Sequence, residues 1–309
     1  MPPTFSFKNF VLLLTFFCYN FIANSQEFGY KEVQLTNNSS DNRYASYNKE
    51  GTIILFESNR TGKWQLYTMD INGEHQKRLL TNSFNDRRPT WHPYKNIILF
   101  ESDRLGMTEI YKLNLDNYKV SKIPIPLAGN KSRAQYAPNG VEIVFNLEDP
   151  KGDFDIYHIH QKGKRPKKLI DDKYNNLYPQ FSRRGNYFLY YSNKNNEKET
   201  DVIYTYNIIT EERSRLTYFK NHSNYAKLSN NKLRVVYSAT VGSGKPEIYI
   251  MKHDGKSKRQ ITFNDEVDIL PSWSPKDINL LISSTRNGYF QICKILLKEP
   301  LEAPEETNE

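Results

Sequence analysis

The chain has 309 residues, of which 38% are hydrophobic and 14% are aromatic, and its formal net charge is +8. This hydrophobic content is sufficient for a core, and the 22 tyrosines and 17 phenylalanines favour strands over helices. The basic residues are scattered apart from one short cluster at residues 162–168, so a nucleic-acid partner is not expected.

The first 25 residues differ in kind from the rest of the chain. Lys8 precedes an apolar run at residues 10–22, and the small-x-small sequence Ala23-Asn24-Ser25 follows. This pattern is typical of a secretory signal peptide, with cleavage expected before Gln26. An uncleaved anchor is the alternative, but the run is shorter than the roughly 20 residues that span a bilayer. We therefore expect an exported protein, periplasmic or secreted, with no transmembrane segment in the mature chain.

The sequence after residue 30 repeats one unit at intervals of 44 to 47 residues. Phrases such as ESNRTGKWQLYTMD at residues 57–70 recur, and their aromatic anchors are Tyr67, Tyr111, Tyr157, Tyr204 and Tyr249, with Cys293 in the last copy. A second column of large residues consists of Tyr47, Trp91, Tyr136, Phe181, Leu228 and Trp273. Six copies in register indicate a repeat architecture.

Each copy is predicted to form four strands. In the second copy, RPTWHP at residues 88–93 contains a short first strand, NIILFESD at residues 96–103 an apolar second strand, and EIYKLN at residues 109–114 an alternating third strand. Tight turns such as residues 59–62 end in a glycine that can adopt positive φ. A four-stranded unit of this length is typical of a propeller blade.

The two ends of the repeat region complement each other. The sixth copy stops after QICKILLKEP at residues 291–300, without a fourth strand, whereas KEVQLTNN at residues 31–38 matches the fourth strands and follows no others. We expect an all-β six-bladed propeller that is closed by the N-terminal strand completing the last blade, which removes exposed sheet edges. The predicted organisation is a signal peptide at residues 1–25, the propeller at 26–298 and an acidic disordered tail at 299–309.

Two segments carry a resemblance to a known family. RPTWHPYKNIILFESDRLGMTEIYKLN at residues 88–114 and LPSWSPKDINLLISSTRNGYFQICKI at residues 270–295 resemble the WD-like repeats of the six-bladed propeller of the TolB family. TolB is the periplasmic component of the Tol-Pal envelope system. The resemblance covers residues 31–298 and implies a role in protein interaction, but it does not extend to the N-terminal α/β domain that TolB also carries.

The first strand of each blade is expected to line the central channel. The columns just before the large residues Tyr47 to Trp273, which we call the second anchors, are therefore candidate sites. Three residues before the anchors stand Tyr44, Arg88, Arg133, Tyr178, Tyr225 and Leu270, a partial ring of side-chain types that are favoured at binding hot spots. The alternative is structural, with the tyrosines wedged between blades and the arginines paired with carboxylates. Replacing Arg88 and Arg133 with glutamate is predicted to weaken partner capture without unfolding the ring.

The column five residues before these large anchor residues contains two carboxylates. Its members are Asn42, Asp86, Lys131, Asn176, Ser223 and Asp268. Asp86 and Asp268 are candidates for the channel mouth, where a pair of carboxylates could serve a glycosidase.

The expected function is a non-enzymatic scaffold that binds a protein of the cell envelope or surface. The first alternative is a carbohydrate-active enzyme or a glycan-binding lectin that uses the channel, and the second is a purely structural module. No cofactor or metal is expected, because no phosphate-binding glycine loop follows a strand and His158 and His160 have no counterparts in other copies.

Overall fold

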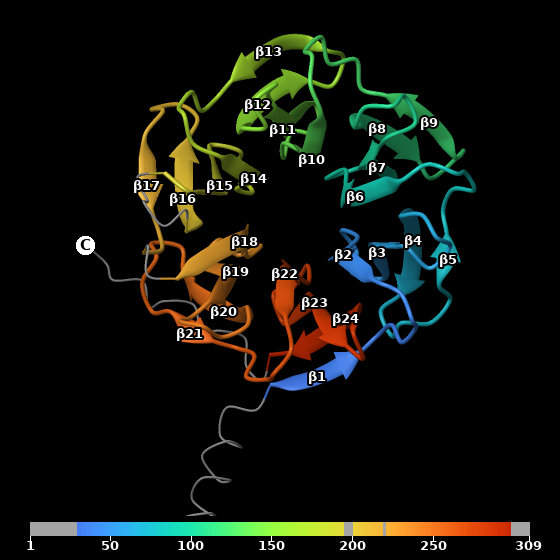
Figure 1. Ribbon diagram of the computed structural model, residues 1–309, viewed down its shortest axis with the longest axis vertical. Coiled ribbons are helices and arrows are strands. Elements are labelled where there is room, and N and C mark those ends of the chain that lie inside the picture. Colours follow the sequence, from blue (N-terminus) through green and yellow to red (C-terminus); the bar gives the residue numbers. More distant parts are fainter. Residues whose placement is uncertain (1–29, 195–199, 219–220, 298–309) are drawn as a thin grey trace, which may run out of the picture.

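The computed structural model describes residues 30–194, 200–218 and 221–297. These residues form six four-stranded antiparallel sheets arranged in a ring around a central axis (Figure 1). The predicted signal peptide and acidic tail lie outside the described residues, and within them no helix is long and apolar enough to cross a membrane.

Five blades run from the inner to the outer strand in chain order, and the sixth takes its outer strand from the N-terminal segment. Blade 1 consists of β2 (Asn42–Tyr47), β3 (Ile53–Ser58), β4 (Gln65–Asp70) and β5 (Lys77–Arg78). Blade 2 consists of β6 (Asp86–Trp91), β7 (Ile97–Ser102), β8 (Glu109–Asn114) and β9 (Lys119–Lys122). Blade 3 consists of β10 (Lys131–Tyr136), β11 (Glu142–Glu148), β12 (Phe154–His160) and β13 (Lys164–Lys168).

The second half of the ring repeats this order. Blade 4 consists of β14 (Asn176–Phe181), β15 (Tyr187–Ser192), β16 (Val202–Asn207) and β17 (Arg213–Arg215). Blade 5 consists of β18 (His222–Leu228), β19 (Arg234–Thr240), β20 (Glu247–Lys252) and β21 (Arg259–Gln260). Blade 6 consists of β22 (Asp268–Trp273), β23 (Asn279–Arg286), β24 (Tyr289–Leu296) and the N-terminal strand β1 (Lys31–Gln34).

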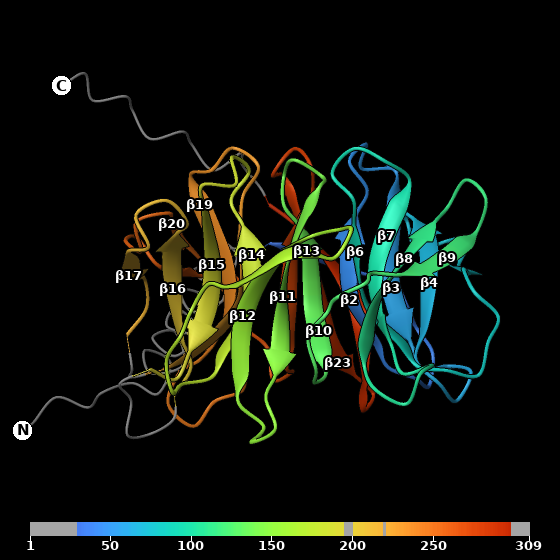
Figure 2. The ribbon, with the colours of Figure 1, turned by 90° about the horizontal axis from the view of Figure 1, so that it is seen from above.

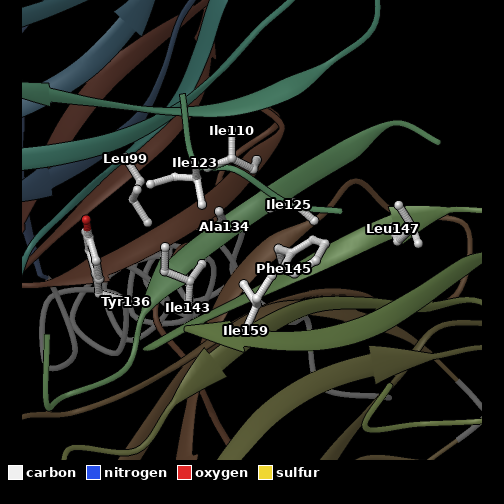
Figure 3. Close-up of a cluster of buried hydrophobic side chains, with 10 residues drawn as sticks. All are labelled: Leu99, Ile110, Ile123, Ile125, Ala134, Tyr136, Ile143, Phe145, Leu147 and Ile159. Atoms are coloured by element: carbon white, nitrogen blue, oxygen red, sulfur yellow. The ribbon is translucent and has the colours of Figure 1, made fainter. Parts of the chain in front are cut away.

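The core lies between the blades. The second strands β3 and β7 both read Ile-Ile-Leu-Phe-Glu-Ser, and five residues of each are buried because a neighbouring blade covers each face of the sheet. Between blades 2 and 3, for example, Leu99 and Ile110 of one blade pack with Ile143 and Phe145 of the next (Figure 3). The ring is therefore held by layers of apolar side chains between its blades, which agrees with the predicted repeat architecture.

The predicted closure is confirmed. β1 pairs with β24 in antiparallel register, with Val33 opposite Lys294. Beyond this strand the Leu35 amide donates to the Ile292 carbonyl at 2.8 Å, and the Thr36 hydroxyl donates to the Gln291 side chain at 2.8 Å. Contacts that join the first and last described segments thus complete blade 6.

The strands connect two faces of the ring (Figure 2). We call the face that bears the loops leading into the inner strands, for example residues 79–85, the front face. The opposite face, which bears the turns that follow the inner strands, for example residues 92–96, is the back face. The hairpins between second and third strands, such as residues 103–108, also lie on the front face.

All six inner strands contain a bulge at the same position. The register of each inner strand with its neighbour shifts there. The third residue of the bulged segment has a positive φ of 46° to 62° in every blade, and these residues are Tyr44, Arg88, Arg133, Tyr178, Tyr225 and Leu270. Positive φ is uncommon for residues other than glycine, so this repeated conformation must be held by its surroundings.

The contacts of the closing segment generate a stability prediction. Leu35 belongs to the same apolar cluster as Met69 and Ile292. The hydrogen bond from its amide to the Ile292 carbonyl matches the one from the Leu79 amide to the Leu66 carbonyl. We expect Leu35→Ala to lower the free energy of unfolding by about 2–5 kcal/mol, as for other buried leucines. Urea unfolding of Leu35→Ala and of the matched control Leu79→Ala should give similar losses. A loss confined to Leu79→Ala would contradict closure through β1.

Candidate functional site

The predicted ring of phenols and guanidiniums is present, and it forms a plug across the channel. Tyr44 and Tyr178 come from opposite blades, and their rings stack with centroids 6.2 Å apart. Tyr225 meets Tyr178 edge-on at 5.0 Å, and Leu270 belongs to the same apolar cluster. The tyrosines therefore meet at the axis instead of wedging between blades, so this part of the structural alternative is wrong. Its other part, an arginine paired with a carboxylate, holds for Arg88.

Arg88 is the electrostatic centre of this plug. Its Nη1 lies 2.6 Å from Glu101 Oε2, and its Nε donates to the Tyr44 hydroxyl at 3.1 Å. Its backbone amide donates to Glu57 Oε2 at 2.5 Å. Both carboxylates are buried, so Arg88 compensates two groups that cannot reach water.

Glu57 and its counterparts hold the left-handed residue of the next blade. Glu101 accepts the Arg133 amide, and the amide oxygen of Asn146 accepts the Tyr178 amide at 3.0 Å. Burial raises the pKa of Glu57 to about 7, although Arg88 and its backbone hydrogen bond oppose this shift. The group that accepts the hydrogen bond from the amide of the left-handed residue is thus a carboxyl in two cases and a neutral side-chain amide in a third.

Arg133 differs from Arg88. No carboxylate in the described part of the chain forms an ion pair with its guanidinium, which donates to Ser132 at 3.0 Å and lies over Phe154 at 5.2 Å. In the sequence the two arginines are equivalent, because they occupy the same column of the repeat. The structure shows that Arg88 is part of the buried ion network, whereas Arg133 has no ion-pair partner among the described residues.

The predicted column that includes Asp86 and Asp268, five residues before the second anchors, does not line an accessible channel mouth. All of its members are at most 3% exposed. Asp86 accepts hydrogen bonds from Arg104 and Asn82, each within 2.9 Å. Asp268 accepts hydrogen bonds from Ser284 of its own blade and from Asn264 in the loop that leads into this blade. The prediction that Asp86 and Asp268 could act at the channel mouth is wrong, because both are fully buried and their oxygens are bonded within the fold.

The repeated Ser-x-Arg sequence explains why this column is buried. Arg104 joins Ser102 Oγ and Asp86 Oδ1, both at 2.9 Å. Arg60 joins Ser58 Oγ at 2.9 Å and Asn42 Oδ1 at 2.8 Å in the same way. The arginine of the repeat therefore fixes the beginning of the inner strand, which is a structural role.

The front face presents a stack of alternating arginine and aromatic side chains near blades 6, 1 and 2. The guanidinium carbon of Arg43 lies 4.3 Å from the ring centroid of Phe290 and 5.3 Å from that of Trp64. Arg87 lies over the same Trp64 ring at 5.2 Å. We call these four residues the arginine–aromatic stack. Phe84, Leu105 and Met107 are exposed on neighbouring loops of the same face.

A cavity of about 360 Å³ occupies the channel between the plug and the back face. Around it runs a ring of side chains that the sequence analysis missed, one residue before each second anchor: Ser46, Thr90, Gln135, Gln180, Lys227 and Ser272. The sequence signal was available, because this column is polar in all six copies although it lies within a strand. We call this space the back cavity.

Lys227 is the one charged member of this ring. The protein surrounds its amine, and this burial lowers its pKa to about 8. The side chain keeps partial contact with solvent through the cavity. No ion pair or hydrogen bond holds the amine within residues 30–194, 200–218 and 221–297.

Among the described residues, one cluster brings together side chains of the types that bind metal ions. Asp70, Glu74 and His75 place ligand atoms within 4.8 Å of one another on the back face. His75 Nδ1 lies 2.9 Å from Asp70 Oδ2, and the other Asp70 oxygen accepts the Asn72 and Glu74 amides. These bonds explain the cluster as the hydrogen-bonding of an exposed turn.

The six blades and the plugged channel define a six-bladed β-propeller. The family model described as TolB beta propeller domain matches residues 62–164 and 148–300. The chain belongs to the TolB β-propeller domain family, as its repeats predicted. No curated protein matches the chain in sequence.

Solved structures share this fold at low sequence identity. TolB from Acinetobacter baumannii has a TM-score of 0.64 at 18% identity, over 84% of this chain and 64% of that protein. A putative TolB from Agrobacterium tumefaciens has a TM-score of 0.61 at 18% identity, over 80% and 79%. An oligogalacturonate lyase in complex with manganese has a TM-score of 0.60 at 14% identity, over 88% and 94%. The chain thus spans 64% of the length of the Acinetobacter TolB, and these similarities show the fold alone.

The network around Arg88 generates a prediction that revises the expected effect of charge reversal. Removing this side chain in Arg88→Met leaves Glu101 buried without its cation, so we expect a loss of about 3–5 kcal/mol in the free energy of unfolding. Arg133→Met is the control and should cost on the order of 1 kcal/mol, because Arg133 forms no ion pair within the described part of the chain. Equal losses in chemical denaturation would contradict this account. For the same reason we revise the expectation for Arg88→Glu: a glutamate there would lie beside the buried Glu57 and Glu101, so we expect it to destabilise the ring.

The raised pKa of Glu57 generates a pH prediction. A carboxyl whose pKa is higher in the folded than in the unfolded chain takes up a proton on folding, so its contribution to stability falls as the pH rises from about 4.5 to 7. Glu57→Gln keeps an acceptor for the Arg88 amide, as Asn146 does for Tyr178, but cannot ionise. We expect the free energy of unfolding of Glu57→Gln to gain roughly 1–3 kcal/mol on that of the wild type between pH 5 and pH 8. A constant difference across this range would refute a titrating Glu57.

Proposed function

We propose that this propeller is an exported, non-enzymatic scaffold that binds another protein of the cell envelope through its front face. The observation that carries the proposal is the arginine–aromatic stack of Phe290, Arg43, Trp64 and Arg87. Tryptophan and arginine are among the side chains most enriched at binding hot spots. Here they come from blades 1 and 2, and Phe290 of blade 6 extends the stack. The exposed Phe84, Leu105 and Met107 extend this surface with apolar area that a partner can cover.

The fold holds this surface rigidly. The Trp64 amide donates to Asn85 Oδ1 at 3.1 Å, which ties a hairpin of blade 1 to the loop that leads into blade 2. The same bond recurs from Thr108 to Asn130 at 3.0 Å and from Phe154 to Asn175 at 2.8 Å. Since these loops are already ordered in the free protein, docking costs little conformational entropy.

The charge of the stack indicates the chemistry of the partner. Arg43 is paired with Asp41 at 2.7 Å, whereas no carboxylate of the described chain pairs with Arg87. A partner that supplies an acidic side chain beside an apolar group would complete Arg87 and cover Trp64 together. A glycosidase is not supported, because the two candidate carboxylates, Asp86 and Asp268, are buried in separate blades.

Site-specific crosslinking in cells of a native-like source tests this proposal. A photo-reactive amino acid at Lys63, an exposed position beside Trp64, should give a discrete protein adduct, and the same group at Lys276 on the back face should not. Adding Arg87→Ala to the Lys63 probe should reduce the adduct about thirtyfold, the effect of a hot-spot residue that contributes about 2 kcal/mol. Equal adducts at both positions, or an adduct insensitive to Arg87→Ala, would contradict a front-face partner site.

A further inference from the structure

The back cavity is unusual in its charge. Its lining includes four cationic side chains, Arg88, Arg133, Arg183 and Lys227, and no aspartate or glutamate. Glu101 and Glu57 offset Arg88 from behind the plug. The remaining positive charge faces a space of about 360 Å³, which has the size of a small-molecule site.

Lys227 is the feature of the cavity that the fold does not explain. Its amine faces the cavity and has no counter-charge among the described residues, and its lowered pKa reports a desolvated cation, which destabilises a protein when it lacks a partner. The other five blades place serine, threonine or glutamine at this position, so the strand geometry does not require a lysine. A residue that costs stability and fulfils no structural requirement is expected where function uses it.

Neutral hydrogen-bonding groups surround the amine. Ser46 Oγ is buried without a partner in the described chain. The Gln180 amide and the Ser272 hydroxyl also line the cavity, and no hydrogen bond holds either side chain within the described ranges. Together with Lys227 they offer an ammonium, two hydroxyls and an amide to a ligand.

The walls of the cavity are aromatic and fixed. Trp273 donates its indole N–H to the Lys227 carbonyl at 3.1 Å, and Trp91 donates its own to the Ser46 carbonyl at 3.2 Å. Each bond joins the tryptophan of one blade to the ring residue of the preceding blade. Apolar walls with a few converging polar groups are the usual composition of ligand sites.

We propose that the back cavity binds a small organic anion whose carboxylate pairs with Lys227 and whose body lies against Trp91 and Trp273. The carboxylate supplies the counter-charge that the amine lacks, and Ser46, Gln180 and Ser272 bind its remaining polar atoms. The plug of Tyr44 and Tyr178 closes the far end of the space, so the ligand enters from the back face. This site is separate from the front-face stack and does not depend on the function proposed above.

Calorimetric titration of the folded mature chain tests the site. The probes are succinate, citrate, benzoate and glucuronate, with glucose as the neutral counterpart of glucuronate. We expect at least one carboxylate to bind with one-to-one stoichiometry and glucose not to bind. Binding of glucuronate alone would identify an acidic sugar as the source of the carboxylate, and binding of the other acids would identify a general organic acid. Absence of binding by all four carboxylates would overturn the proposal.

The variant Lys227→Gln tests the role of the amine. It reproduces the residue that blades 3 and 4 carry at this position, so the fold accommodates it. We expect binding to weaken by at least about tenfold, while the unligated variant melts at a higher temperature than the wild type because the unpaired charge is gone. Lys227→Arg should retain binding, and Lys276→Met, an exposed control on the same face, should change neither property. Unchanged binding in Lys227→Gln would overturn the assignment.

The pH dependence of binding provides a second readout. The other charged or titratable groups that face the cavity are Arg88, Arg133, Arg183, Tyr44, Tyr136 and Tyr178. Arginine stays protonated, and burial raises the pKa of Tyr136 to about 12 and that of Tyr178 well above its usual value. Because burial places the pKa of Lys227 near 8, affinity should fall as the pH rises through this value. A pH-independent affinity between pH 7 and 9 would contradict pairing with Lys227.

Discussion

One left-handed residue in each inner strand determines how the centre of the propeller is built. This conformation turns the amide of the residue out of the sheet, and in three blades a side chain of the preceding blade accepts it. The same turn directs the side chain toward the axis, so six long side chains meet there and close the channel. Inter-blade bonding, the plug and the separation of the front face from the back cavity are therefore consequences of a single backbone constraint.

The plug has a polar half and an apolar half. The acceptor position is occupied by Glu57, Glu101 and Asn146 in the first three blades, and there it bonds to the next blade. In the other half the hydroxyls of Ser238 and Ser283 are buried and have no hydrogen-bond partner among the residues that the structure describes. Apolar packing of Tyr191 and Leu270 replaces the hydrogen bonds there. A fold with sixfold backbone symmetry thus combines ionic and apolar packing at its axis, so we expect neighbouring ring positions to respond differently to substitution.

The sequence was sufficient to predict the blades, the closure and the ring at the axis, because repeated columns of aromatic and apolar residues report burial directly. It was not sufficient to predict which residues of the inner strand face the channel. Asp86 and Arg88 are two residues apart and would share a face in a regular strand. The bulge breaks this alternation, so Asp86 turns into the blade and bonds with Arg104, whereas Arg88 and Thr90 line the back cavity. Lys227 was missed because only the columns three and five residues before the second anchors were taken as candidates.

The position of β1 also has a kinetic consequence. Its pairing partner β24 lies about 260 residues away in the sequence, so the sixth blade cannot form until nearly the whole chain is available. Before that moment the partial ring has open strand edges on both sides and no closed axis. Contacts of such high sequence separation form slowly, because loop closure costs entropy before the contacts repay it. A chain built in this way stays incompletely folded until its last strand is available to pair with β1.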